Sequence, residues 1–193
     1  MFINPNNKFN NGENEKFKSL ITKLIDLGKR IKIKTGENPI TEGYNCDFFY
    51  FIESGKFRTF RFLEDKEVTI GFTFKGDLDT SPYSFYNNLP SKDTIQALSD
   101  GTVVKVYHDQ LERLGQEEQI LEEFIRYMQS SYIETLIQRF LEFKVNTAEI
   151  RYLDMLKKQP DELRGIPLQY LASYLGISKE RLSRIRKKHS KLT

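Results

Sequence analysis

The chain has 193 residues, of which 38% are hydrophobic and 30% charged, and it contains no run of about 18 apolar residues that could span a bilayer. This composition indicates a globular protein and excludes a membrane-spanning helix. Because the N-terminal segment also lacks the apolar stretch of a secretory signal, we expect a cytoplasmic protein. The single cysteine, Cys46, and the two histidines, His108 and His189, form no disulfide, iron–sulfur, haem or zinc ligand set, so we expect no metal and no cofactor.

The net charge of +3 is unevenly distributed along the chain. Residues 178–193 contain seven Lys and Arg but only one Glu, a net charge of +6, which leaves −3 for residues 1–177. A basic patch at one end of a mildly acidic protein indicates a polyanionic partner such as a nucleic acid, because Lys and Arg neutralise phosphates.

The first expected elements are a helix at about residues 15–27, which Gly28 ends, and a series of short strands between Ile31 and Tyr107. The strand segments are rich in β-branched and aromatic residues, and Gly, Pro, Asn and Asp separate them. Many short strands at this spacing predict a barrel or a sandwich. We therefore expect residues 1–110 to form a helix and a β-barrel.

A long helix is expected next, because residues 117–143 contain neither Gly nor Pro. Apolar residues recur there every three or four positions, at Leu121, Ile125, Met128, Tyr132, Leu136 and Phe140. A helix of about 40 Å is too long for one small barrel to cover. We expect a dimerisation helix at 111–145 that packs against a second copy in a homodimer. The alternative is that its apolar stripe packs only on its own barrel.

Residues 146–193 are expected to form a separate helical domain. Asn146 followed by Glu149 has the pattern of a capping box, which predicts a helix that begins near Thr147 and stops before Pro160.

The most specific motif lies in residues 168–187, LQYLASYLGISKERLSRIRK. Its apolar residues can form the shared core of two short helices, Ala172 is small where the helices cross, Gly176 suits the turn, and Ser178 can cap the second helix. The segment predicts a helix-turn-helix, with a plain helical hairpin as the alternative.

The outer face of the second helix carries the predicted DNA-contacting residues. Lys179, Glu180 and Arg184 are expected to read bases, because Arg and Lys donate to guanine and Glu accepts from cytosine. The expected phosphate-contacting or supporting residues are Ser178, Arg181, Ser183, Arg186, Lys187, Lys188 and Lys191.

The phrases FFYFIESGKFRTF, EVTIGFTFKGD and TIQALSD, together with the helix-turn-helix, resemble the cyclic-AMP receptor/fumarate-nitrate regulator (Crp/Fnr) family, in particular its short Bacteroidetes-type members. The resemblance extends over about residues 20–188. It implies an α+β chain with an N-terminal cyclic-nucleotide-binding-like β-barrel (jelly roll), a long dimerisation helix and a C-terminal all-α helix-turn-helix domain. The usual β-hairpin wing is not expected, because only residues 189–193 follow the second helix.

The same resemblance implies a homodimer on double-stranded DNA, with paired recognition helices in successive major grooves. RNA polymerase is a further candidate partner. The family's base-reading pattern of a basic residue, Glu and then Arg falls on Lys179, Glu180 and Arg184.

The expected effector site departs from the family pattern. Cyclic-nucleotide binders have a Gly-Glu pair at the ribose and an Arg at the phosphate, whereas this chain has Gly76-Asp77 and Ser91-Lys92-Asp93. Lys92 lacks the planar fork of Arg, and Asp93 opposes an anion, so we expect no tight cyclic-AMP binding. Candidate pocket residues for an unidentified small-molecule effector are Gly76, Asp77, Tyr83, Phe85, Tyr86, Lys92 and Ser131. Alternatively, the barrel is only a dimer scaffold.

The sequence therefore predicts a homodimeric, sequence-specific DNA-binding transcription regulator and no enzyme. The alternative is a ligand-binding or protein-interaction module that does not bind DNA. If the barrel responds to a ligand, we expect residues 145–147 to act as the hinge that sets the spacing of the two recognition helices.

Overall fold

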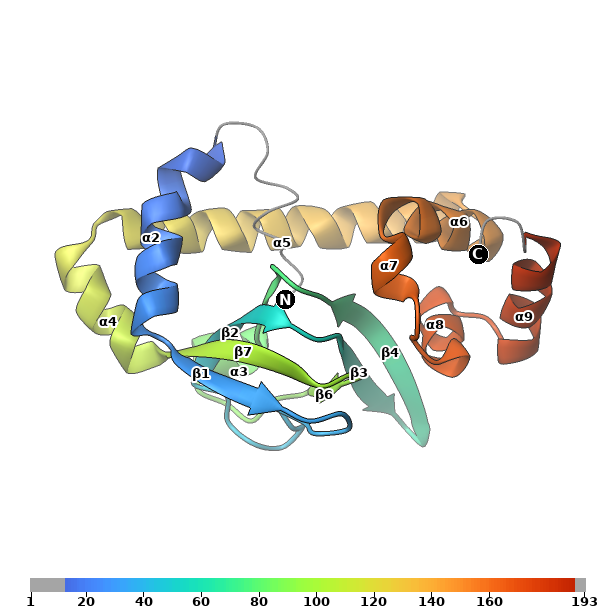
Figure 1. Ribbon diagram of the computed structural model, residues 1–193, viewed down its shortest axis with the longest axis horizontal. Helices are drawn as coiled ribbons and strands as arrows, with labels where there is room; N and C mark the ends of the chain where they lie inside the picture. The colour runs from blue at the N-terminus through green and yellow to red at the C-terminus, as the bar shows by residue number, and fades with distance from the viewer. Residues whose placement is uncertain (1–12, 190–193) are drawn as a thin grey trace.

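The computed structural model describes residues 13–189 and consists of a β-barrel, a long helix beside it and a helical C-terminal domain at the far end of that helix (Figure 1). Helix α2 (Glu13–Leu27) precedes the barrel, and Gly28 ends it by donating its N–H to the Leu24 carbonyl at 3.1 Å. No helix in this range is both long enough and apolar enough to cross a lipid bilayer.

Two antiparallel sheets form the barrel, as the short strands predict. The four-stranded sheet has the order β1-β7-β2-β5, with β1 (Lys29–Ile33), β2 (Phe48–Ser54), β5 (Leu78–Asp79) and β7 (Gly101–Tyr107). The three-stranded sheet has the order β4-β3-β6, with β3 (Phe57–Leu63), β4 (Lys66–Thr73) and β6 (Thr94–Ala97). The segment between β5 and β6, within the range where the sequence predicts short strands and turns, contains the short helix α3 (Pro82–Asn87).

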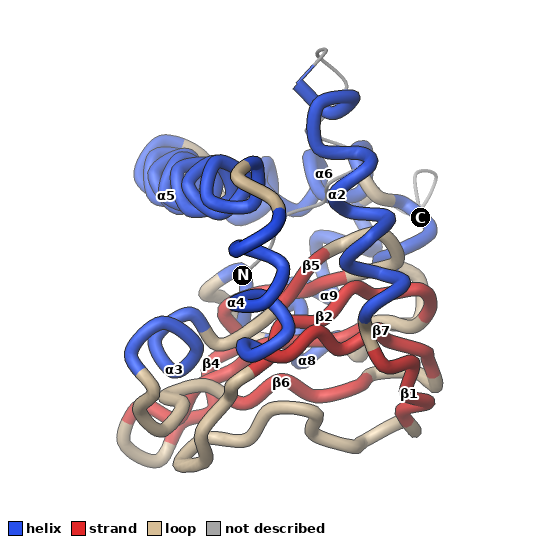
Figure 2. Tube along the Cα trace, turned by 90° about the vertical axis from the view of Figure 1, so that its left-hand side faces the viewer, coloured by secondary structure: helices blue, strands red, loops and turns tan. Residues whose placement is uncertain are grey.

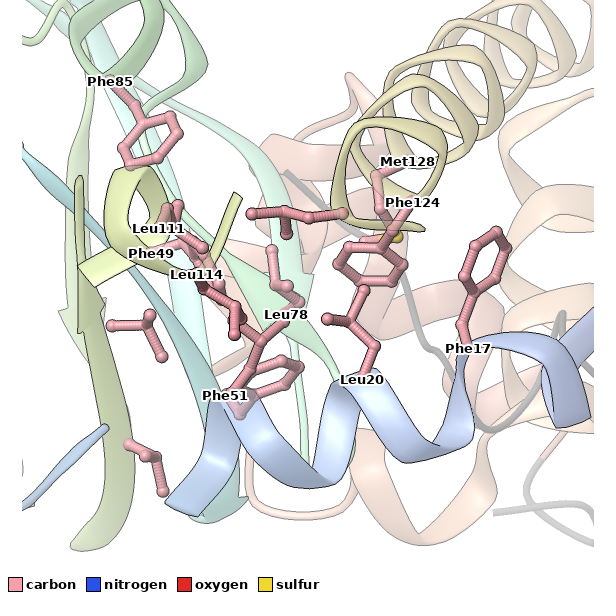
Figure 3. Close-up of a cluster of buried hydrophobic side chains, with 14 residues drawn as sticks. Phe17, Leu20, Phe49, Phe51, Leu78, Phe85, Leu111, Leu114, Phe124 and Met128 are labelled. Carbon is pink, nitrogen blue, oxygen red and sulfur yellow. The ribbon is translucent and has the colours of Figure 1, made fainter. Parts of the chain in front are cut away.

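Alternating side chains of β2 serve two separate cores, because successive residues of a strand point to opposite faces. Tyr50 and Ile52 point into the barrel, where they pack with Phe57 of β3. Phe49 and Phe51 point outward and lie under helices α2, α4 (His108–Glu117) and α5 (Ile120–Val145). Figure 3 shows this outer cluster, in which α2 and α5 meet above the sheet.

The long helix is shorter than the expected 111–145, because Glu118 and Gln119 separate α4 from α5. Figure 2 shows α5 nearly end-on, beside the barrel rather than inside it. Its first half buries Leu121, Phe124 and Met128 against the barrel and α2. Its second half is uncovered, and Phe140 is 60% exposed. Within this chain the predicted apolar stripe is thus covered for only half its length.

The C-terminal domain consists of α6 (Ala148–Lys158), α7 (Pro160–Leu163), α8 (Leu168–Leu175) and α9 (Lys179–Lys188). Helix α6 begins where the sequence predicts, but its N-cap is Thr147, whose hydroxyl accepts from the Ile150 N–H, while Asn146 is the C-cap of α5. The expected absence of a wing concerns residues 190–193, which lie outside the described residues.

Candidate nucleic-acid interface

Helices α8 and α9 form the predicted helix-turn-helix. The turn passes through Gly176 in the left-handed conformation, with φ 68°, and the Ile177 N–H returns to the Ala172 carbonyl at 3.0 Å. Ser178 caps α9 by accepting a hydrogen bond from the Arg181 N–H. The two helices share a core of Leu171, Ala172, Leu175, Leu182 and Ile185, all buried. The local sequence thus fixes both the turn and the start of the second helix.

The face of α9 opposite this core is polar and exposed. At about 100° per residue, Lys179, Glu180, Ser183, Arg184 and Lys187 fall on the side of the helix away from its two buried residues. All five are exposed. The three predicted base-reading residues therefore lie together on one accessible surface, which we call the reader face and define by these five residues.

Glu180 is held ionised on the reader face. Its own backbone N–H and the Ser178 hydroxyl donate to its carboxylate, and Lys179 and Arg184 add positive charge nearby, so its pKa lies below the ordinary value. An ionised carboxylate only accepts hydrogen bonds, which is the property needed to recognise a cytosine amino group.

Two predicted phosphate-contacting residues are bonded within the domain. Arg186 Nε donates to the Tyr152 hydroxyl at 3.0 Å, and Lys188 Nζ donates to Glu149 Oε1 at 2.8 Å. His189 Nε2 lies 2.7 Å from the same Glu149 oxygen. These contacts tie the C-terminal end of α9 to α6, so Arg186 and Lys188 support the helix in this structure. Arg181 is exposed beside the reader face, and Lys191 lies outside the described residues.

Helix α8 also docks the domain onto its own barrel, and it lies between β4 and α9 (Figure 1). The buried Arg58 guanidinium stacks on the Tyr170 ring at 3.5 Å from its centroid and forms an ion pair with Glu67. The Thr69 N–H donates to the Ser173 hydroxyl at 2.9 Å. Because α8 is used for this contact, the reader face of α9 remains accessible.

The predicted effector residues do not converge on one site. Gly76 and Asp77 form the turn between β4 and β5, where Asp77 is buried and accepts from the Phe74 N–H at 2.8 Å. Lys92 instead stacks on Tyr83, with Nζ 3.9 Å from the ring centroid. Among the described residues, no hydrogen bond or ring contact joins Gly76 or Asp77 to that pair.

The other pocket candidates lie along α3 and α5. Phe85 is buried against Phe49, Tyr86 is partly exposed, and Ser131 is half-buried on α5. Two surface clefts have volumes of about 300 and 220 Å³, and neither is lined by any predicted effector residue. Phe85 and Tyr86 do line a third cavity, between the barrel and α5, but its volume is only about 30 Å³. The cleft of about 300 Å³ lies between the barrel turns and α7, lined by residues that include Lys56, Lys75, Asp100 and Glu162.

Asp93 has a cationic partner that the sequence did not reveal. Arg61 Nε donates to Asp93 Oδ1 at 2.8 Å, from β3 to the segment before β6. The pairing register of β3 with β6 creates this contact, and no local motif indicates it. The buried Asp93 carboxylate thus lies next to Lys92, in the segment where cyclic-nucleotide binders have their phosphate-binding Arg.

The chain thus combines a barrel, a long helix and a helix-turn-helix with an exposed basic face. Residues 30–118 match the family model of the cyclic nucleotide-binding domain. The chain has the same fold as FixK2 from Bradyrhizobium japonicum, with a TM-score of 0.74 and 17% identity over 85% of each chain.

Two further solved structures have this fold. The c-di-GMP-responsive global regulator CLP of Xanthomonas campestris gives a TM-score of 0.66 at 17% identity, over 90% of this chain and 92% of CLP. The catabolite activator protein of Thermus thermophilus gives 0.54 at 18% identity, over 90% and 83%. No curated protein matches the sequence. These findings confirm the fold that the resemblance implies, with a cyclic-nucleotide-binding-like barrel, a long helix and a C-terminal helical domain.

Proposed function

We propose that this protein is a transcription regulator that binds double-stranded DNA sequence-specifically as a homodimer. The main support for the proposal is the reader face, an exposed polar surface on the second helix of the helix-turn-helix. Second helices of this motif lie in the DNA major groove. Such a role places the protein in the cytoplasm of a bacterium, and it requires no catalysis.

Three side chains of the reader face are assigned to bases. Arg184 donates two hydrogen bonds to guanine O6 and N7, Glu180 accepts from a cytosine amino group, and Lys179 donates to a second guanine. Arg181, Ser183 and Lys187 contact phosphates around them. In this arrangement Arg184 determines specificity most strongly, because its planar fork matches guanine better than an ammonium group does.

The uncovered half of α5 supports the homodimer. Ile133, Ile137, Phe140 and Leu141 are each between 46% and 60% exposed on this segment. Such a concentration of large apolar side chains is typical of a protein interface. A second copy packed against it by a two-fold axis would present two reader faces to half-sites about 34 Å apart, one turn of DNA.

The barrel is proposed to be a sensor or scaffold domain that does not hold cyclic AMP tightly. Lys92 is engaged with Tyr83 on the surface, and Arg61 is paired with the neighbouring Asp93 carboxylate, so both of these cations already have a partner within the protein. The effector, if the protein has one, is therefore expected to have a different charge distribution.

Selection from a pool of random-sequence DNA duplexes tests the proposal. The wild-type protein should enrich a near-palindromic site, and the affinity for that site should fall steeply with salt concentration. Arg184→Ala should change the enriched base at one position of each half-site. Gln169→Ala, on α8 and away from the reader face, is the matched control. Folded protein that enriches no sequence would contradict the proposal and favour the alternative of an interaction module.

A further inference from the structure

At the junction between the long helix and the C-terminal domain, Lys158 of α6 pairs with Glu142 of α5, and Arg151 of α6 bonds to both α5 and α8. Its Nη1 donates to the carbonyl of Asn146 at 2.6 Å, and its Nη2 donates to the carbonyl of Leu175 at 2.7 Å. A longer contact of 3.5 Å joins Nη1 to the Phe143 carbonyl. Asn146 is the C-cap of α5 and Leu175 is the last residue of α8. One guanidinium group therefore joins the C-terminal ends of two helices.

Both of these helix ends favour a cation. The last carbonyl groups of a helix have no partner within it, and the helix dipole adds partial negative charge there. A guanidinium has donors on a rigid plane, so it can bond to two helix ends at fixed relative positions, whereas an ammonium is a single point of charge. Arg151 thus fixes the orientation of α8 with respect to α5 as well as bonding to both.

Phe143 adds an apolar contact at the same place. The Arg151 guanidinium carbon lies 4.5 Å from the centre of the Phe143 ring. A Cβ atom added at Gly176 would lie 3.4 Å from the Phe143 ring, so the last turn of α5 packs on the turn of the helix-turn-helix. Phe143, although 60% exposed, thus gives the end of α5 a second point of contact with the helix-turn-helix.

We propose that Arg151 is a positioning residue that makes the helix-turn-helix follow the orientation of α5. The inference rests on the proposed function, since its consequence is the relative position of two reader faces on DNA. It replaces the free hinge expected at residues 145–147 by a bridged junction. The orientation of α5 then sets the spacing of the half-sites through Arg151, together with the contacts that hold α8 on the barrel.

The first test needs neither DNA nor a dimer. Spin labels are attached at Ser130→Cys on α5 and Gln169→Cys on α8, both exposed positions, in a Cys46→Ser background. The labelled chain is diluted with unlabelled protein, so that only distances within one chain are measured. We expect a narrow distribution of label-to-label distances for the otherwise wild-type protein, a broader one for Arg151→Gln and one of intermediate width for Arg151→Lys.

Arg126→Gln is the matched control, because Arg126 is exposed on α5 and, among the described residues, forms its ion pair with Glu122 of the same helix. Arg126→Gln also removes one positive charge, but at a position away from the junction. The distribution of label-to-label distances should therefore stay narrow. If Arg151→Gln does not fold, Arg151→Lys carries the test alone. A distribution as narrow as that of the control in every folded Arg151 variant would overturn the inference.

The second test uses DNA duplexes that carry two copies of the half-site selected by the wild-type protein, separated by spacers of different lengths. Arg151→Gln should bind a single half-site as the wild type does, but its affinity at the best spacing should fall about tenfold and its preference for that spacing should weaken. A merely structural role would lower single-site binding or the melting temperature instead. An unchanged spacing preference would contradict the inference, whereas failure of the wild type to select any DNA would contradict only the proposed function.

Discussion

Replacing Asp77 by Asn should make the stability of the protein less dependent on pH. Burial of Asp77 raises the pKa of its carboxyl from the ordinary 3.8 to about 7, opposed by the Phe74 N–H and assisted by the charges of Asp79 and Glu162. A carboxyl that holds its proton more tightly when folded stabilises the fold at low pH, and that contribution is lost as pH rises from about 4 to about 7. At about 1.4 kcal/mol per pH unit, the loss has a ceiling of about 4 kcal/mol.

Asn resembles the protonated acid in shape and charge, and its side-chain carbonyl can still accept from the Phe74 N–H. Asp77→Asn and wild type should therefore have similar free energies of unfolding near pH 4, and the variant should become more stable as pH rises, by at most about 4 kcal/mol above pH 7. Urea unfolding at a fixed protein concentration, followed by circular dichroism, measures this difference. The exposed Asp26→Asn is the control for the change in net charge. A difference between Asp77→Asn and wild type that stays constant across this pH range would refute the reasoning.

Further substitutions test the reader face, the dimer interface and the helix-turn-helix turn. Arg184→Ala should weaken binding to the selected site by about 1 to 3 kcal/mol and reduce the preference for one base pair of each half-site. Lys187→Ala should mainly reduce the slope of log affinity against log salt, by about one, in a binding titration. If Lys187→Ala changed the base preference and Arg184→Ala changed only the slope, the two roles would be exchanged. Phe140→Glu should yield monomers in sedimentation experiments, because it puts a charge into the uncovered half of α5; an unchanged dimer would place the interface elsewhere. Ser178→Ala should destabilise α9 by about 1 kcal/mol in thermal unfolding through loss of its cap, an effect that exposed Ser183→Ala should not reproduce.

The helix-turn-helix could be predicted residue by residue because its determinants are local. The positive φ of Gly176, the cap at Ser178 and the apolar spacing of two short helices all lie within a few turns of chain. The fold of the barrel followed from strand periodicity in the same way. By contrast, α3 lies where the sequence predicts only strands and turns, because this helix has no side-chain cap and only Pro82 marks its first turn.

Contacts between residues far apart in the chain could not be predicted from the sequence. Arg58, Arg61 and Arg151 pair with groups that only strand register or helix packing brings close. The partners of Arg186 and Lys188 were missed for the same reason. Both residues were expected to contact phosphates, but helix packing brings them to α6, where they bond to Tyr152 and Glu149. The predicted effector residues were grouped by likeness to a family pattern, and the fold separates the β4–β5 turn from the Tyr83–Lys92 pair.

Binding of the purified protein to DNA duplexes at increasing salt concentration, compared between wild type and Arg184→Ala, tests the central claim most directly. If the reader face recognises DNA, the wild type should bind the selected duplex tightly at about 50 mM salt, and log affinity should fall steeply and linearly with log salt. Arg184→Ala should discriminate less well between the selected duplex and a scrambled one. Folded wild-type protein that binds the selected duplex no better than a scrambled one would contradict sequence-specific recognition.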